Sequence, residues 1–147
     1  MTPSPASTLA APAPATPAAP PMQVLALAEP MPGFPGHRDF VLVAADGAGL
    51  LFWLQSVAPD GPRFLAVPAA PFFPDYAPVL PRAACAELGI TDGAEGEIYC
   101  LVTVPDGDVD ASTANLRAPI VVNPATHRAR QIVLTDGGLP IRQPLRR

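Results

Sequence analysis

Few side chains in this sequence could act as a nucleophile and its base: two cysteines, Cys85 and Cys100, and two histidines, His37 and His127. A thiol activated by a neighbouring imidazole would give a cysteine nucleophile, but none of these residues are close together in the chain. Cys100 lies in an apolar run and Cys85 in a predicted helix, where cysteine acts as a small core hydrophobe. We therefore expect buried free thiols, and we keep an enzyme with a cysteine nucleophile as the alternative.

The stretch from Asp106 to Asp110 begins like a calcium-binding loop, with aspartates at alternate positions. However, Ala111 replaces the glycine that such a loop needs at its sixth position, and Arg117 replaces the glutamate at its twelfth. The sequence also lacks nucleotide-binding, zinc-protease and serine-hydrolase motifs. We expect no catalytic residues, no metal and no cofactor, and we predict a solvated acidic turn instead.

Charge is unevenly distributed along the chain, whose formal net charge is −4. Residues 83–116 hold seven acidic side chains and no cation, whereas residues 117–147 hold six arginines and one aspartate. Because a net acidic protein binds nucleic-acid phosphates poorly, we expect no direct nucleic-acid contact. Proline or charge interrupts every long apolar run, and no signal-peptide pattern is present, so we expect a cytoplasmic protein without membrane contact.

Proline supplies 22 of the 147 residues, and seven prolines stand beside seven alanines in the first 21 residues. That stretch has no apolar periodicity, which predicts a disordered Pro/Ala-rich tail over residues 1–21, either a solubilising spacer or a PxxP ligand. One domain over residues 22–147 follows. Its 15 prolines argue against a helical protein, because each interior proline costs a helix about 3 kcal/mol.

Short apolar runs between turn signals predict an all-β barrel or sandwich with one small helix. The run 50–55 is apolar almost throughout, which indicates burial on both faces or a barrel wall. The Asn123-Pro124 turn predicts a β-hairpin. The predicted strands cover residues 24–28, 40–43, 50–55, 64–67, 98–104, 118–122 and 130–134, and the predicted helix covers 82–88.

Aromatic residues occur at two informative places. Phe52 and Trp53 are adjacent in one strand and so point to opposite faces, one into the core and one toward a helix or a partner. Phe72, Phe73 and Tyr76 lie in a proline-rich loop. An exposed cluster there would indicate a protein interface, and burial under a folded-back loop is the equal alternative.

Five segments, in order and spacing, resemble the flagellar assembly factor FliW family. They are PGFPGHRDFVLV (32–43), LLFWLQS (50–56), FFPDY (72–76), TANLRAPIVVNPATHRARQIVL (113–134) and LPIRQPL (139–145). The segments GHRDFVLV and FFPDYAPVL resemble the actinobacterial branch of this family. The resemblance implies a small, monomeric β-barrel-like protein of the cytosol that is not an enzyme.

The resemblance also implies two alternating partners. One is flagellin, held before export as by a chaperone. The other is CsrA, an RNA-binding translational regulator that represses flagellin synthesis and that FliW-like proteins antagonise. Excess flagellin would occupy the protein and free CsrA to silence the flagellin message. A scaffold for other flagellar export components is a further alternative.

Loop and turn residues of two kinds are our candidates for partner contacts. Apolar side chains without an obvious local reason for exposure suit flagellin or CsrA, and the acidic stretch suits a basic RNA-binding partner. Asn115, like Asn123, is expected to form a turn through its side chain, with direct partner contact as the alternative. The candidates are Phe34, Phe72, Tyr76, Asp106, Asp108, Asp110, Asn115 and Leu116.

The N-terminal stretch departs from the family pattern. Family members usually carry an additional strand before the one that leads into the PGF loop, and here the Pro/Ala stretch occupies that place. We expect either a barrel that is open at this edge and available to a partner strand, or a misassigned or remodelled start.

Overall fold

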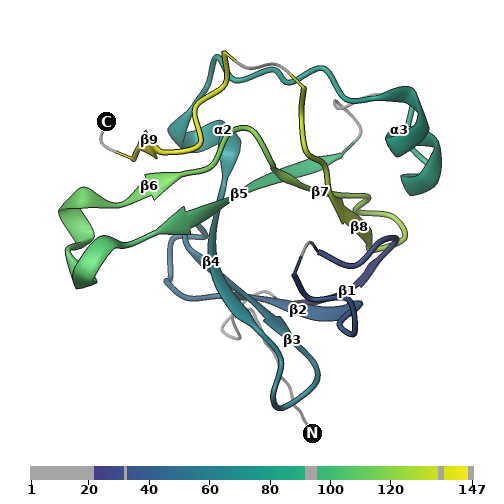
Figure 1. Ribbon diagram of the computed structural model, residues 1–147, viewed down its shortest axis with the longest axis horizontal. Coiled ribbons are helices and arrows are strands. Elements are labelled where there is room, and N and C mark those ends of the chain that lie inside the picture. The colour runs from purple at the N-terminus through teal and green to yellow at the C-terminus, as the bar shows by residue number, and fades with distance from the viewer. Residues whose placement is uncertain (1–21, 32, 92–95, 136–137, 146–147) are drawn as a thin grey trace, which may run out of the picture.

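The computed structural model describes residues 22–31, 33–91, 96–135 and 138–145. Seven strands form a closed barrel in the order β1-β2-β3-β4-β5-β7-β8, and β8 pairs back with β1 (Figure 1). The strands of the barrel are β1 (Met22–Leu27), β2 (Asp39–Ala44), β3 (Phe52–Ser56), β4 (Arg63–Pro68), β5 (Glu97–Thr103), β7 (Ile120–Val122) and β8 (Arg128–Gln131). The all-β fold predicted from the sequence is confirmed as a barrel.

Further short elements surround the barrel. The strands β6 (Thr113–Ala114) and β9 (Gln143–Pro144) extend the sheet beside β5. Between β4 and β5 lie the helices α2 (Ala69–Phe72) and α3 (Arg82–Leu88), and two 3₁₀ turns, at Pro105–Gly107 and Val109–Ala111, link β5 to β6. Within the described ranges, no helix is long and apolar enough to cross a membrane.

The barrel closes through β1, so the first of the two alternatives, a barrel open at this edge, is wrong for the described strands. β1 pairs antiparallel with β2 from Met22 to Ala26 and parallel with β8 at Ala26 and Leu27. The backbone N–H of Ala26 donates to the carbonyl of His127 at 3.0 Å. The backbone N–H donors of β1 begin directly after the proline-rich stretch. This strand therefore hydrogen-bonds to both β2 and β8 without an additional strand. The predicted tail, residues 1–21, lies outside the described residues.

The predicted hairpin and helix are confirmed. Helix α3 has the predicted bounds and ends at Gly89, whose positive φ of 77° suits glycine. Strands β7 and β8 form the hairpin, but β7 begins two residues later than predicted and β8 two residues earlier. The tight turn explains the shift of β8, because the N–H of His127 donates to the carbonyl of Asn123 and the N–H of Asn123 to that of Arg128.

The interior of the barrel is filled by alternate residues of its strands. In β3, Phe52 and Leu54 face inward and are buried, whereas Trp53 between them points outward and is half-buried. Phe52 packs edge-on against Tyr99 of β5, with 5.5 Å between ring centroids. The apolar run in this strand is therefore a barrel wall, as the sequence predicts.

Two further apolar clusters cover the outside of the barrel. Helix α3 packs Cys85 and Leu88 against Val121 of β7. The segment around α2 packs against the outer side of β4 and β5, where Val67 and Cys100 are buried. Both cysteines are free and buried, which confirms the predicted role as core residues. Figure 1 shows α2 and α3 on one side of the barrel and β1–β3 on the other.

Candidate functional site

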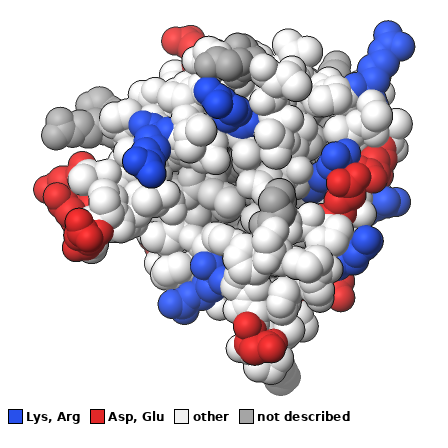
Figure 2. All heavy atoms as spheres, viewed as in Figure 1, with Lys and Arg blue, Asp and Glu red and all other residues white. Residues whose placement is uncertain are grey.

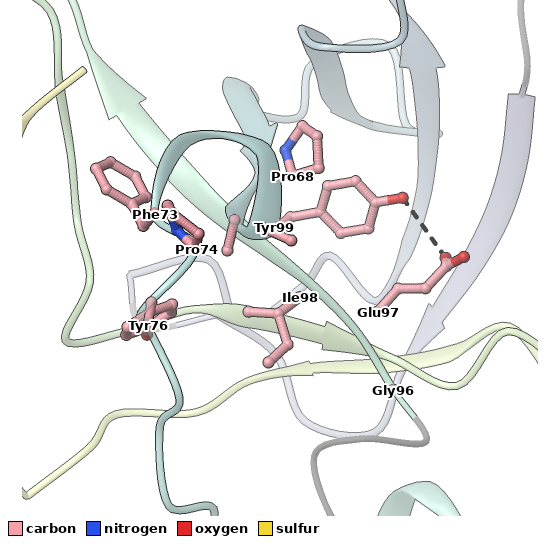
Figure 3. Close-up of a pocket in the computed structure, with 10 residues that line it drawn as sticks. Pro68, Phe73, Pro74, Tyr76, Gly96, Glu97, Ile98 and Tyr99 are labelled. Carbon is pink, nitrogen blue, oxygen red and sulfur yellow. Dashed lines mark hydrogen bonds between the residues drawn. The ribbon is translucent and has the colours of Figure 1, made fainter. Parts of the chain in front are cut away.

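The first candidate surface is a groove of about 410 Å³ between α2 and the start of β5 (Figure 3). Strand β4 ends at Pro68, which pairs with Tyr99, and helix α2 begins at the next residue. Proline lacks a backbone N–H and cannot donate to the ladder, so the β4–β5 pairing ends at Pro68 and β5 has no β4 neighbour before Tyr99. The gap beside this part of β5 is the groove, and we call it the aromatic groove. Its lining includes Pro68, Ala70, Phe73, Tyr76, Glu97 and Ile98.

Tyr76 forms one wall of the aromatic groove and is held in place by hydrogen bonds to two backbone carbonyls. Its hydroxyl donates a short hydrogen bond to the carbonyl of Leu116, and its backbone N–H donates to the carbonyl of Phe73 at 3.0 Å. Burial raises the pKa of the Tyr76 hydroxyl well above its usual value, and the nearby Cys100 raises it further. The phenol is therefore neutral, and its hydroxyl is already bonded to Leu116 while the residue lines the groove.

Tyr99 and Glu97 lie on β5 at the other side of the aromatic groove. The Tyr99 hydroxyl donates to Glu97 Oε1 at 3.5 Å, and Figure 3 shows this contact as a dashed line. Burial, followed by the charge of Glu97, raises the pKa of Tyr99 to about 12. The groove thus combines aromatic and aliphatic walls with one carboxylate, a composition that fits an apolar peptide segment.

The second candidate surface is the acidic turn between β5 and β6, defined as Asp106, Asp108 and Asp110. All three side chains are exposed, as the sequence predicts. Asp108 Oδ1 accepts the backbone N–H of Asp110 at 3.1 Å, and Asp106 has a positive φ of 50°. Figure 2 shows acidic side chains gathered at the left, where this turn lies in Figure 1. Among the described side chains, no group of three or more potential metal ligands occurs.

The structure brings three of the apolar candidates together and separates the fourth. Phe72, Tyr76 and Leu116 belong to the same outer cluster. Phe34 instead packs edge-on against Phe64 of β4, with 5.6 Å between centroids, next to the interior cluster. Leu116 is only 6% exposed, so the expectation that its side chain is exposed is wrong. Packing of the α2 segment over the outer side of β5 accounts for its burial.

Asn115 forms the turn that the sequence predicts. Its Oδ1 accepts the backbone N–H groups of Arg117 at 2.9 Å and Ala118 at 3.2 Å. Asn123 does the same in the β7–β8 turn, where its Oδ1 accepts the N–H of Ala125. Its Nδ2 also donates to the carbonyl of Leu88, at the end of α3, at 2.8 Å. Both asparagines therefore have a structural role, because their side chains hold these turns through hydrogen bonds.

Sequence reasoning missed most of the aromatic groove. Of the candidate residues only Tyr76 lines it, beside Phe73, Ile98 and Glu97, which were not selected. The alternation of β5 would have assigned Ile98 to the same face as Cys100. Nothing local shows that β4 ends opposite Tyr99, and this long-range pairing creates the groove.

The described geometry does not favour a cysteine nucleophile. Burial raises the pKa of the Cys100 thiol to about 12, so it carries no thiolate near neutral pH. His37 hydrogen-bonds through Nδ1 to Ser56 Oγ at 2.9 Å. His127 is exposed in the β7–β8 turn, whereas both cysteines are buried.

Comparison with known proteins gives a consistent result. The family model described as "FliW protein" matches residues 13–145 and so begins inside the predicted tail. The flagellar assembly factor FliW of Moorella thermoacetica is 36% identical over 114 residues, which cover 78% of this chain and 72% of that protein. The corresponding protein of Symbiobacterium thermophilum is 37% identical over 115 residues, with 77% and 82% covered.

A solved structure shares the fold. The crystal structure of the flagellar assembly factor FliW superposes with a TM-score of 0.73 at 30% sequence identity, covering 83% of this chain and 84% of that chain.

Proposed function

Because the chain belongs to the FliW family, we propose that it acts in flagellar assembly by binding flagellin in the cytosol and antagonising the translational regulator CsrA. The observation that carries this proposal is the match over residues 13–145 to a family whose relatives are named flagellar assembly factors. Two surfaces of different chemistry, the aromatic groove and the acidic turn, are available for two partners. The role needs binding and no catalysis.

We assign flagellin to the aromatic groove. An apolar segment of flagellin would bury its side chains against the walls formed by Phe73, Tyr76 and Ile98. Ala70 of α2 lines the groove and is exposed, so a glutamate at that position places a charge in the groove with little effect on folding. Ala86 of α3 is also an exposed helical alanine but lies outside the groove, which makes it a matched control.

The experiment measures flagellin binding by titration calorimetry with the full chain. Ala70→Glu is expected to weaken binding about tenfold, because burying one unpaired carboxylate costs more than 1.4 kcal/mol. Ala86→Glu is expected to bind like the unmodified protein. Equal affinities for the two variants would contradict the assignment of flagellin to this groove.

We assign CsrA to the acidic turn. An RNA-binding partner carries a basic surface, and exposed carboxylates on a projecting turn would attract it. Replacing Asp106, Asp108 and Asp110 by asparagine removes three charges, keeps an acceptor oxygen at Asp108 and tolerates the positive φ at Asp106. A matched control replaces three other exposed aspartates in the same way: Asp39, Asp60 and Asp75.

The variant of the acidic turn is expected to bind CsrA about tenfold more weakly at low salt, and the difference is expected to shrink as salt screens the charges. The control variant has the same net charge and is expected to keep its affinity. If both variants lose affinity equally, CsrA responds to overall charge and the assignment to this turn is wrong.

The two partners are expected to exclude each other. Adding flagellin to a complex of this protein with CsrA is expected to release CsrA, and by linkage CsrA must weaken flagellin binding by the same factor. A pull-down in competition format measures the release. Simultaneous binding of both partners would contradict the coupling, and failure to bind either would contradict the proposed function.

A further inference from the structure

The outward side of strands β1–β4 carries a row of apolar side chains. Strand pairing places Met22 beside Val43, Val43 beside Trp53, and Trp53 beside Leu65, so the row crosses four strands. Met22 is 64% exposed. Antiparallel sheets that face water usually alternate between apolar inward and polar outward positions. This row departs from that pattern, because it holds no charged side chain.

A second row runs beside the first. Pairing places Val24, which is 56% exposed, beside Val41, followed by Gln55 and Arg63. The guanidinium carbon of Arg63 lies 4.3 Å from the centroid of the Trp53 ring, so the arginine stacks on the indole. We define the outer apolar face as Met22, Val24, Val41, Val43, Trp53 and Leu65.

The chain itself carries a segment suited to this face. Residues 1–21 lie outside the described structure, contain seven prolines and seven alanines and no charged side chain, and join β1 at Met22. Met22 is the first residue of the outer apolar face. Proline-rich segments bind surfaces in which an aromatic ring is flanked by apolar side chains, because their extended conformation loses little entropy on binding.

We propose that residues 1–21 pack across the outer apolar face of the same molecule, with proline rings against Trp53. The distance across four strands is three strand spacings, about 14 Å. About five residues of polyproline helix span this distance, so the 21 available residues suffice and allow the chain to turn back at Met22. Covalent attachment gives the segment a high effective concentration at the face, so modest contacts keep it there.

The test uses the natural reporter on this face, because Trp53 is the single tryptophan of the chain. Quenching of its fluorescence by acrylamide measures access to the indole. In the full-length chain, the variant with four tail prolines replaced by serine is expected to show about twice the quenching of the unmodified protein, because the covering segment is released. The four replaced prolines are Pro12, Pro14, Pro17 and Pro20.

A pair of valine variants tests the proposal by changing the face instead of the tail. Val24→Glu places a charge on the outer apolar face and is expected to increase quenching of Trp53 as the tail variant does. Val133→Glu is the control, because Val133 is 61% exposed and lies outside the face. It is expected to leave quenching unchanged.

Two results would overturn the proposal. Unchanged quenching in the tail variant means that the prolines do not cover Trp53. Protection of Trp53 that grows with protein concentration, together with dimers in sedimentation, means that a second copy covers the face instead. Protection that is independent of concentration and lost in both the tail variant and Val24→Glu supports packing within one molecule.

Discussion

The outside of the barrel has two contrasting sides. On the side of β5, β7 and β8, helix α3 and the segment around α2 cover the strands, and Val121 and Cys100 are fully buried. On the side of β1–β3, Met22 and Val24 stand exposed, and Trp53 is half-buried with Arg63 stacked on it. The outward residues of both sides are largely apolar.

The outward apolar residues therefore have different roles on the two sides of the barrel. On the covered side they form an ordinary core whose loss costs stability. On the exposed side no described element covers them, and our proposal attributes them to packing of residues 1–21 of the same molecule. The aromatic groove lies on the covered side, where the α2 segment leaves the start of β5 without a neighbour from β4.

The largest effect is expected from the helix that covers one side. Leu88 of α3 is 0% exposed, and Leu88→Ala is expected to lower the free energy of unfolding by about 2–5 kcal/mol, because it leaves a cavity. The matched truncation on the other side, Val24→Ala, is expected to cost less than about 1 kcal/mol. Urea denaturation measures both. Similar losses would show that the two sides are equally important for stability.

A smaller effect is expected where the hairpin turn holds α3. Asn123→Ala removes the hydrogen bond to the carbonyl of Leu88 and the one from the N–H of Ala125. Because Asn123 is buried, a loss of about 1–3 kcal/mol is expected. The control Asn115→Ala also breaks a turn but is only partly buried, so it is expected to cost less. The reverse order in urea denaturation would contradict this role of Asn123.

The buried thiol of the covered side predicts a loss of stability at alkaline pH. The folded protein holds the pKa of Cys100 at about 12, whereas the unfolded chain releases this proton near pH 9. The unfolded state therefore binds fewer protons above pH 9, and stability is lost as pH rises from 9 toward 12.

Cys100→Val keeps an apolar side chain in the same place and is expected to flatten this loss between pH 9 and 10. The tyrosines still contribute above pH 10, because burial also raises the pKa of Tyr99 to about 12 and that of Tyr76 further. Thermal unfolding across this pH range provides the measurement. An unchanged slope between pH 9 and 10 would assign the loss to other groups.

The smallest effect is expected on the exposed side. Arg63→Ala removes the guanidinium from the Trp53 ring and is expected to cost about 0.5–1 kcal/mol, the usual size of an exposed cation–π contact. A shift of the tryptophan emission is expected with it. Arg142→Ala, at another exposed arginine, is the control. If both variants lose the same stability, the stacking contributes nothing measurable.

Local features of the fold could be predicted from the sequence. The end of α3 follows from Gly89, which stops the helix, and the β7–β8 hairpin follows from the turn at Asn123. Buried thiols follow from the apolar surroundings of Cys85 and Cys100. Each of these depends on residues within a few positions of one another, where backbone preferences and side-chain periodicity decide.

The candidate surfaces were predicted less well. The acidic turn is exposed as expected, because three aspartates so close together remain solvated. Leu116 is buried although it lies in a turn, since Phe72 and Tyr76 pack into the same cluster from a distant part of the chain. The groove residue Ile98 was missed because β4 and β5 lie far apart in sequence.

Composition and local pattern are thus enough to predict an all-β domain of short strands, its turns and its family. Proline density, apolar alternation and turn residues act locally, and five motifs in order identify the relatives. Three features could be seen only in the folded molecule: β1 closes the barrel against β8, one side of the wall is covered, and the other side is exposed. These features depend on pairings between distant segments, and local sequence does not encode which loop folds over which strand.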